Sequence, residues 1–149
     1  HTGIIVTLGQ SAANQGCTLL AKSCKQKLVS RSTTEAELIA LHEALPHLIW
    51  LRSLLTELGY PPTSPSILYQ DNQSTIRICN KGHGYKSKTK HMDVRYYFVK
   101  DKIEDKTVTV MYLPTADMTA DYLTKPLGGN IHDVHLNHLL GPQNKHKNE

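Results

Sequence analysis

A long stretch with leucine at helical spacing, residues 33–58, constrains the fold more than any other part of this sequence. Ser32 followed three residues later by Glu35 matches the capping-box pattern that begins many helices. Pro46 predicts a kink or a division of the helix, and Gly59 predicts its end. At about 100° per residue, one face carries an apolar stripe, made of Leu41, Ala44, Leu45, Leu48, Leu51 and Leu55.

One acid lies on this apolar stripe. Glu37 falls inside it, whereas Glu35 points away from it, as an ordinary first-turn acid does. A carboxylate on a core-facing stripe costs free energy unless a cation or a hydrogen-bond donor meets it. Glu37 is therefore either a partly exposed acid at the end of the stripe or a metal-facing or catalytic carboxylate at the mouth of a core.

The other predicted elements alternate between strands and helices. Runs rich in β-branched and apolar residues predict strands, and segments with helical periodicity predict helices. The strands are residues 3–8, 17–23, 67–69 and 107–113, and the further helices are 75–80, 91–104, 116–124 and 131–140. This order predicts an α/β fold, a mixed sheet with helices packed on it. Trp50 and residues 96–98 are expected to pack in the core.

Composition limits the class of protein. The 149 residues suffice for one domain, which we assign to residues 1–140, followed by a polar, disordered tail at 141–149. The net charge of +4 is compatible with nucleic-acid binding but does not establish it. Three cysteines without a CxxC pair fit a reducing, intracellular compartment, and no apolar run is long enough to span a membrane. The first residue is His1 rather than Met, which indicates a fragment or a processed piece.

Three acids occupy comparable places in the predicted topology. Glu37 lies in the first turn of a helix, Asp71 follows a strand, and Asp121 lies in a helix directly after a strand. Side chains at strand ends can converge, and converging carboxylates repel each other unless a hard cation such as Mg²⁺ or Mn²⁺ neutralises them. Two such ions roughly 4 Å apart promote phosphodiester hydrolysis. The alternatives are a helix N-cap for Asp71 and an exposed helix residue for Asp121, with Asp117 as the inward acid instead.

Four motifs in succession, at residues 32–41, 69–74, 87–97 and 120–127, resemble the signatures of one family. They are STTEAELIAL, YQDNQS, SKTKHMDVRYY and ADYLTKPL, and they resemble the ribonuclease H domain of Ty1/copia-type retrotransposon polyproteins. The resemblance covers residue 2 to residue 140 and implies a ribonuclease H-like fold. It also implies hydrolysis of the RNA strand of RNA–DNA hybrids with two Mg²⁺ or Mn²⁺ ions during reverse transcription.

The same resemblance assigns the site and the partners. By position, the catalytic and metal-binding residues are Glu37, Asp71 and Asp121. The partners are the RNA–DNA hybrid and the reverse transcriptase domain of the same polyprotein, with no membrane. The location is the cytoplasm, in a retroelement particle, with the nucleus as a second compartment.

The sequence departs from the family pattern at its beginning. The family has a first strand with a further catalytic Asp, and this chain begins after that strand, with no acid before Glu35. We therefore expect an N-terminally truncated fold with three acids instead of four, impaired activity, and exposed sheet edges that favour self-association. The alternative function is a non-catalytic module, from a decayed or domesticated element, that binds nucleic acid or protein.

A basic loop at residues 81–90 is the candidate nucleic-acid contact. Lysines beside aromatic side chains can meet phosphates and stack on a base or sugar, here with Lys86, Lys88, Lys90 and His91. Asn72, Gln73 and Ser74 beside Asp71 are candidate donors to 2′-hydroxyl groups. A solvated loop is the alternative for the lysines, and a structural helix-start residue is the alternative to a proton carrier for His91. His132, His135 and His138 are interpreted as a solvent-facing stripe rather than a metal site.

Overall fold

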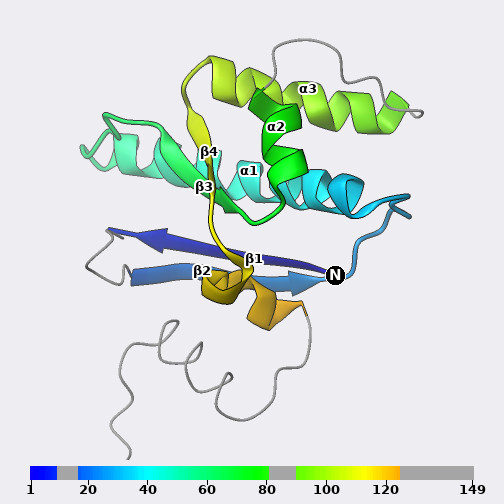
Figure 1. The fold of residues 1–149 in the computed structure, drawn as a ribbon. Helices are drawn as coiled ribbons and strands as arrows, with labels where there is room; N and C mark the ends of the chain where they lie inside the picture. Colours follow the sequence, from blue (N-terminus) through cyan, green and yellow to red (C-terminus); the bar gives the residue numbers. More distant parts are fainter. Residues whose placement is uncertain (10–16, 81–89, 125–149) are drawn as a thin grey trace, which may run out of the picture. The chain divides into compact units, whose positions relative to one another are not determined.

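The computed structural model describes residues 1–9, 17–80 and 90–124 (Figure 1). Contacts divide the chain into two compact units, one of residues 1–25 with 119–149 and one of residues 26–118. The predicted basic loop up to residue 89, the predicted helix at 131–140 and the tail at 141–149 lie outside the described residues.

The first unit is built on a β-hairpin. Strands β1 (Thr2–Leu8) and β2 (Cys17–Cys24) pair antiparallel, with an irregular register between Val6 and Thr7. A short 3-10 helix, η2 (Thr119–Leu123), packs on β1 in the same unit. A Cβ at Gly3 would overlap the carbonyl oxygen of Ala120, so only glycine allows this close approach. The hydroxyl of Ser23 also donates to the carbonyl oxygen of Leu123 at 2.5 Å.

The second unit contains the long helix predicted from the leucine pattern. Helix α1 (Thr33–Glu57) begins at the N-cap Ser32, whose Oγ accepts from the backbone N–H of Glu35 at 3.2 Å. The Glu35 carboxylate accepts from the backbone N–H of Arg31 at 2.7 Å. In the usual capping box this acid accepts from the N–H of the N-cap residue, which here is Ser32, one residue later. Pro46 is exposed and does not divide the helix. The buried residues of α1 are Leu38, Ile39, Leu41, Leu45 and Leu48.

A two-stranded parallel sheet and two more helices complete this unit. Strands β3 (Ser66–Gln70) and β4 (Val108–Tyr112) pair from Ser66↔Val108 to Gln70↔Tyr112. Helices α2 (Gln73–Asn80) and α3 (Lys90–Glu104) contact α1 and each other, and α2 lies between the other two in Figure 1. The core beyond α1 consists of Leu68, Cys79, Met92, Tyr96, Val99, Val108 and Val110.

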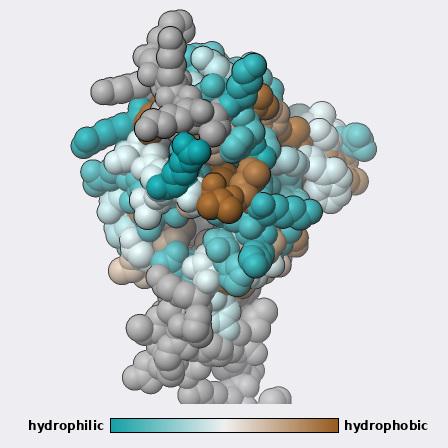
Figure 2. All heavy atoms as spheres, turned by 90° about the vertical axis from the view of Figure 1, so that its right-hand side faces the viewer, coloured by the Kyte–Doolittle hydropathy of each residue, from teal (hydrophilic) through white to brown (hydrophobic). Residues whose placement is uncertain are grey.

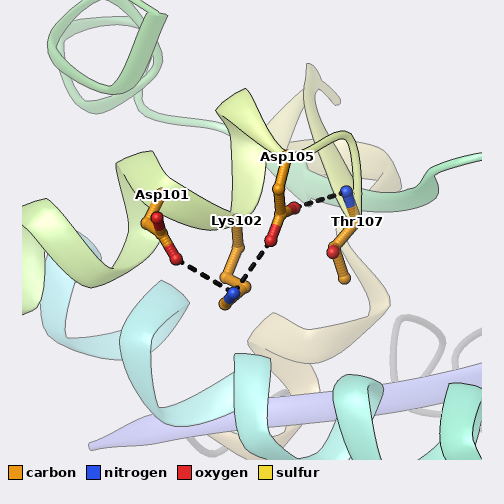
Figure 3. Close-up of polar contacts among 4 residues, drawn as sticks. All are labelled: Asp101, Lys102, Asp105 and Thr107. Carbon is orange, nitrogen blue, oxygen red and sulfur yellow. Dashed lines mark hydrogen bonds and ion pairs between the residues drawn. The ribbon is translucent and has the colours of Figure 1, made fainter.

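The turn from α3 to β4 is held by charged side chains (Figure 3). Lys102 Nζ lies 2.9 Å from Asp101 Oδ2 and 2.8 Å from Asp105 Oδ2. The other oxygen of Asp105 accepts from the backbone N–H of Thr107 at 2.8 Å. Lys106, between them, has a φ of 60°, the left-handed conformation that closes the turn.

The structure confirms the predicted α/β class and is compatible with a ribonuclease H-like fold. Parallel and antiparallel pairings both occur, in two separate two-stranded sheets. The predicted helix at 116–124 is wrong, because the segment forms two 3-10 turns, η1 (Thr115–Asp117) and η2. Such short segments lack the turns that stabilise an α-helix.

The prediction that the aromatic residues pack in the core is confirmed for two of them and wrong for the other two. Tyr96 is 2% exposed and Phe98 packs against the core, but Trp50 is 65% exposed and Tyr97 59%. Trp50 lies two residues after Leu48, which places it on the far side of the helix from the buried stripe. On the face drawn in Figure 2, hydrophobic side chains form small patches among hydrophilic ones. Among the described residues, no helix has the length and apolar character to cross a membrane.

Candidate metal and active site

Glu37 and Asp71 come from different elements of the second unit, and a hydrogen bond between α1 and α2 brings the surrounding elements together. Glu37 lies in the second turn of α1, not in the predicted first turn, and is half-buried beside the core residue Leu38. Asp71 directly follows β3, and α2 begins two residues later. The hydroxyl of Thr75, in the first turn of α2, donates to the carbonyl oxygen of Thr34 at 3.5 Å. The beginnings of α1 and α2 therefore lie side by side.

Asn72, not Asp71, caps helix α2. The Asn72 Oδ1 atom accepts from the backbone N–H groups of Ser74 at 3.0 Å and Thr75 at 3.1 Å. A side-chain oxygen in this position satisfies N–H groups that have no partner within the helix. The sequence left both residues open as the cap. Because Asn72 fills this role, the Asp71 carboxylate makes a different contact.

That contact is with Thr115 in η1. The backbone N–H of Leu113 donates to the carbonyl oxygen of Gln70 at 3.0 Å, which continues the pairing of the two strands past the end of β4. Two residues later, the Thr115 hydroxyl donates to Asp71 Oδ2 at 2.9 Å. The half-buried Asp71 carboxylate is thus held at the ends of both strands.

Gln70 links the two acids. Its side chain is on the buried face of β3, two residues after Leu68, and the residue is only 4% exposed. Its Nε2 donates to Glu37 Oε2 at 3.1 Å, and its Oε1 accepts from the backbone N–H groups of Asp71 at 2.8 Å and Asn72 at 3.0 Å. Gln70 therefore joins the Glu37 carboxylate to the backbone of Asp71, although 33 residues separate Glu37 from Gln70.

Asp121 belongs to the other unit. It lies in η2, is half-buried, and its carbonyl oxygen accepts from both the backbone N–H and the hydroxyl of Thr124, at 3.0 and 2.8 Å. Asp117, the alternative inward acid, is exposed in η1 of the second unit. The predicted acids Glu37 and Asp71 thus belong to one unit, and Asp121 belongs to the other.

The pair has the chemistry of a hard-cation site. Mg²⁺ is commonly bound through one or two carboxylates while it keeps several water molecules. Glu37 and Asp71 supply such oxygens, and the N-terminus of α2 beside them adds only a partial positive charge. Among residues 1–9, 17–80 and 90–124, no three His, Cys, Asp or Glu side chains form a metal-binding group. The chemistry of the carboxylate oxygens of Glu37 and Asp71 fits Mg²⁺ or Mn²⁺.

The predicted nucleic-acid contacts are only partly described. Gln73 and Ser74 are exposed at the beginning of α2, next to Asp71, while Asn72 is half-buried. Lys90 and His91 are exposed in the first turn of α3, where the carbonyl oxygen of His91 accepts from Arg95 at 2.7 Å. Lys86 and Lys88 lie outside the described residues, as do His132, His135 and His138.

Sequence reasoning missed two residues of this site, Gln70 and Thr115. For Gln70 a signal was present, because the period of two along β3 places it on the same face as Leu68, and a glutamine on a buried face needs hydrogen-bond partners. For Thr115 no signal was present, since its role depends on where η1 lies relative to β3.

Comparison with known proteins adds independent evidence. The chain is 40% identical over 105 residues to the retrovirus-related Pol polyprotein from transposon TNT 1-94 of Nicotiana tabacum, a match that covers 70% of this chain and 8% of the polyprotein. It is 38% identical over 105 residues to that of transposon RE1 of Arabidopsis thaliana, covering 70% and 7%. It is 35% identical over 106 residues to the transposon Ty1-NL2 Gag-Pol polyprotein of Saccharomyces cerevisiae, covering 71% and 6%.

The chain is homologous to a region of retrotransposon Pol polyproteins. It spans less than a tenth of the length of these relatives. No protein-family model matches the chain, and no solved structure matches it. The homology therefore supports a retroelement origin, and the activity of the region has to be argued from the residues described above.

Proposed function

We propose that this chain is the ribonuclease H region of a retrotransposon Pol polyprotein. In this proposal it cuts the RNA strand of RNA–DNA hybrids during reverse transcription, beside the reverse transcriptase domain of the same polyprotein. One observation carries the proposal: Gln70, buried at the end of β3, joins the Glu37 carboxylate to the backbone N–H of Asp71, although these acids are far apart in sequence. The homology to Pol polyproteins supports it.

The proposed chemistry assigns a role to each residue. Glu37 and Asp71 would hold Mg²⁺ or Mn²⁺ through carboxylate oxygens, and the resemblance to the family assigns Asp121 the same role. Bound divalent ions would activate the attacking water and stabilise the leaving oxygen of the phosphodiester. Thr115 keeps the Asp71 carboxylate in place through its bond to Oδ2. Gln73 and Ser74, exposed next to Asp71, would contact the sugar hydroxyls of the RNA strand.

A hybrid with one labelled strand at a time tests this function. We expect the chain to cut the RNA strand and not the DNA strand, only with Mg²⁺ or Mn²⁺, and to lose cleavage in EDTA. The Glu37→Gln variant should fail to cut, because a neutral amide neither balances the cation charge nor accepts at both atoms. Cleavage of both strands alike, or cleavage that persists in EDTA, would contradict the proposal.

The second candidate is a non-catalytic module that binds the hybrid. The exposed polar and basic side chains of Gln73, Ser74, Lys90 and His91 support it. It predicts salt-sensitive hybrid binding without cleavage, and equal binding by the wild-type chain and the Glu37→Gln variant.

A further inference from the structure

We propose that Gln70 is a positioning residue that holds Glu37 and Asp71 as one preorganised pair of cation ligands. This inference rests on the proposed function, because it takes these two acids as the metal-binding residues. It begins from the burial of Gln70, which is 4% exposed and hydrogen-bonded at both ends of its side-chain amide.

The hydrogen bonds fix the orientation of that amide. The end near the backbone N–H groups of Asp71 and Asn72 has to accept, and the end near the Glu37 carboxylate has to donate. Rotating the amide by 180° would place NH₂ against two N–H donors and an oxygen against the Glu37 carboxylate. Only a side chain with both a donor and an acceptor at this reach satisfies all three groups.

Each bond controls one acid. The bond from Nε2 fixes Glu37 Oε2 and therefore the direction of that carboxylate at the beginning of α1. The two bonds to Oε1 fix the backbone where the chain leaves β3, which sets the direction in which Asp71 projects. A glutamate here would place a third negative charge beside the pair, whereas the neutral amide adds a donor without charge.

Such support should raise the affinity for a cation. Groups that hydrogen-bond to metal ligands keep these ligands in the binding geometry, and their loss commonly weakens metal binding by roughly 10- to 100-fold. The effect should appear without any nucleic acid, because the bonds of Gln70 lie within the chain.

The test is Mn²⁺ binding by the folded chain, measured from the loss of the electron paramagnetic resonance signal of free Mn²⁺. We expect the Gln70→Met variant, of similar length without donor or acceptor, to raise the Mn²⁺ dissociation constant roughly 10-fold or more. Gln70→Asn, which stays polar but is too short to reach both sides, should weaken binding as well and serves if the methionine variant does not fold. The matched control is Thr109→Val, on the exposed face of the same sheet.

A double substitution separates positioning from a general loss of structure. In a Glu37→Gln background, Gln70→Met should weaken Mn²⁺ binding much less than in the wild type, because one of the two ligands it holds is already gone. Unchanged Mn²⁺ affinity of folded Gln70→Met and Gln70→Asn would overturn the inference, and so would a wild-type chain that binds no Mn²⁺. If Mn²⁺ binds and depends on Gln70 while the hybrid stays uncut, the nuclease proposal fails and the positioning role stands.

Discussion

Single polar side chains decide how the elements of the second unit begin and end. Ser32 accepts at the start of α1, Asn72 caps α2, and Gln70 joins the end of β3 to α1. Each satisfies a backbone N–H or a carboxylate, and a hydrogen bond of this kind contributes about 0.5–1.5 kcal/mol of net stability. Because Asn72 caps α2, the Asp71 carboxylate does not have to accept from the first N–H groups of that helix.

Asp105 likewise holds the turn between α3 and β4 with a single side chain (Figure 3). The ammonium group of Lys102 and the N–H of Thr107 stabilise the charged carboxylate and lower the pKa of Asp105 from 3.8 to about 2. Because the pKa is lower in the folded state, this stabilisation is complete above about pH 4 and is lost as the pH falls through about 2.

We predict that Asp105→Asn lowers the free energy of unfolding by about 0.5–1 kcal/mol near pH 6, a value reduced by solvent screening because the side chain is 39% exposed. Urea unfolding at pH 6, 4 and 2.5 measures it, and the difference from the wild type should shrink at the lowest pH. Asp101→Asn removes an ion pair with Lys102 but no backbone bond, and it should cost less. A difference that is constant with pH would contradict this explanation.

At the scale of elements, the packing of η2 on β1 depends on one glycine. A methyl group at Gly3 would overlap the backbone oxygen of Ala120 and press against Leu123. Since a backbone atom cannot rotate away, η2 itself has to shift. This element carries Asp121, so the glycine also governs where that acid lies within its unit.

We predict that Gly3→Ala destabilises the chain by about 1–3 kcal/mol and loosens η2. Hydrogen exchange of the Thr124 amide, which donates to the carbonyl oxygen of Asp121, reports on η2 directly and should become faster. Gly9→Ala is the control: its φ of 77° disfavours alanine, but a methyl group there meets no atom within 4 Å. Equal exchange of Thr124 in the two variants would show that η2 does not depend on Gly3.

Elements with a strong hydrophobic period were predictable from the sequence. The long helix, its N-cap at Ser32 and the four strands follow from apolar spacing and from capping chemistry, which are local. The two 3-10 helices at 115–123 were not predictable, because segments of three and five residues are too short to show a hydrophobic period. Contacts with neighbouring elements decide the form of such segments.

At the scale of the whole molecule, the candidate site was predictable only in part. The three acids could be named from their places after strands and in a first helical turn, since these places are read along the chain. The hydrogen bonds from Gln70 to Glu37 and from Thr115 to Asp71 could not be predicted, because they join residues 33 and 44 positions apart. Long-range hydrogen bonds leave no spacing rule in a single sequence.

The basic loop is expected to bind the nucleic acid through its lysines. Replacing Lys86, Lys88 and Lys90 by glutamate should weaken binding to an RNA–DNA hybrid and reduce the slope of affinity against salt by roughly one per lost phosphate contact. Binding measured at several salt concentrations tests this. A second triple variant, with glutamate at the exposed Lys25, Lys27 and Lys106, changes the net charge equally. If both variants lose the same affinity, net charge rather than the loop determines binding.

Cleavage of an RNA–DNA hybrid by the Asp71→Asn variant tests the central claim most directly. The substitution keeps the size of the side chain and removes its charge, whereas Asp101→Asn makes the same change on the exposed surface of α3. Under single-turnover conditions with Mg²⁺, we predict that Asp71→Asn slows cleavage by at least roughly 100-fold and that Asp101→Asn cuts at the wild-type rate. Equal cleavage by the wild type and Asp71→Asn, or no metal-dependent cleavage by the wild type, would contradict the assignment of Glu37 and Asp71 as a catalytic pair.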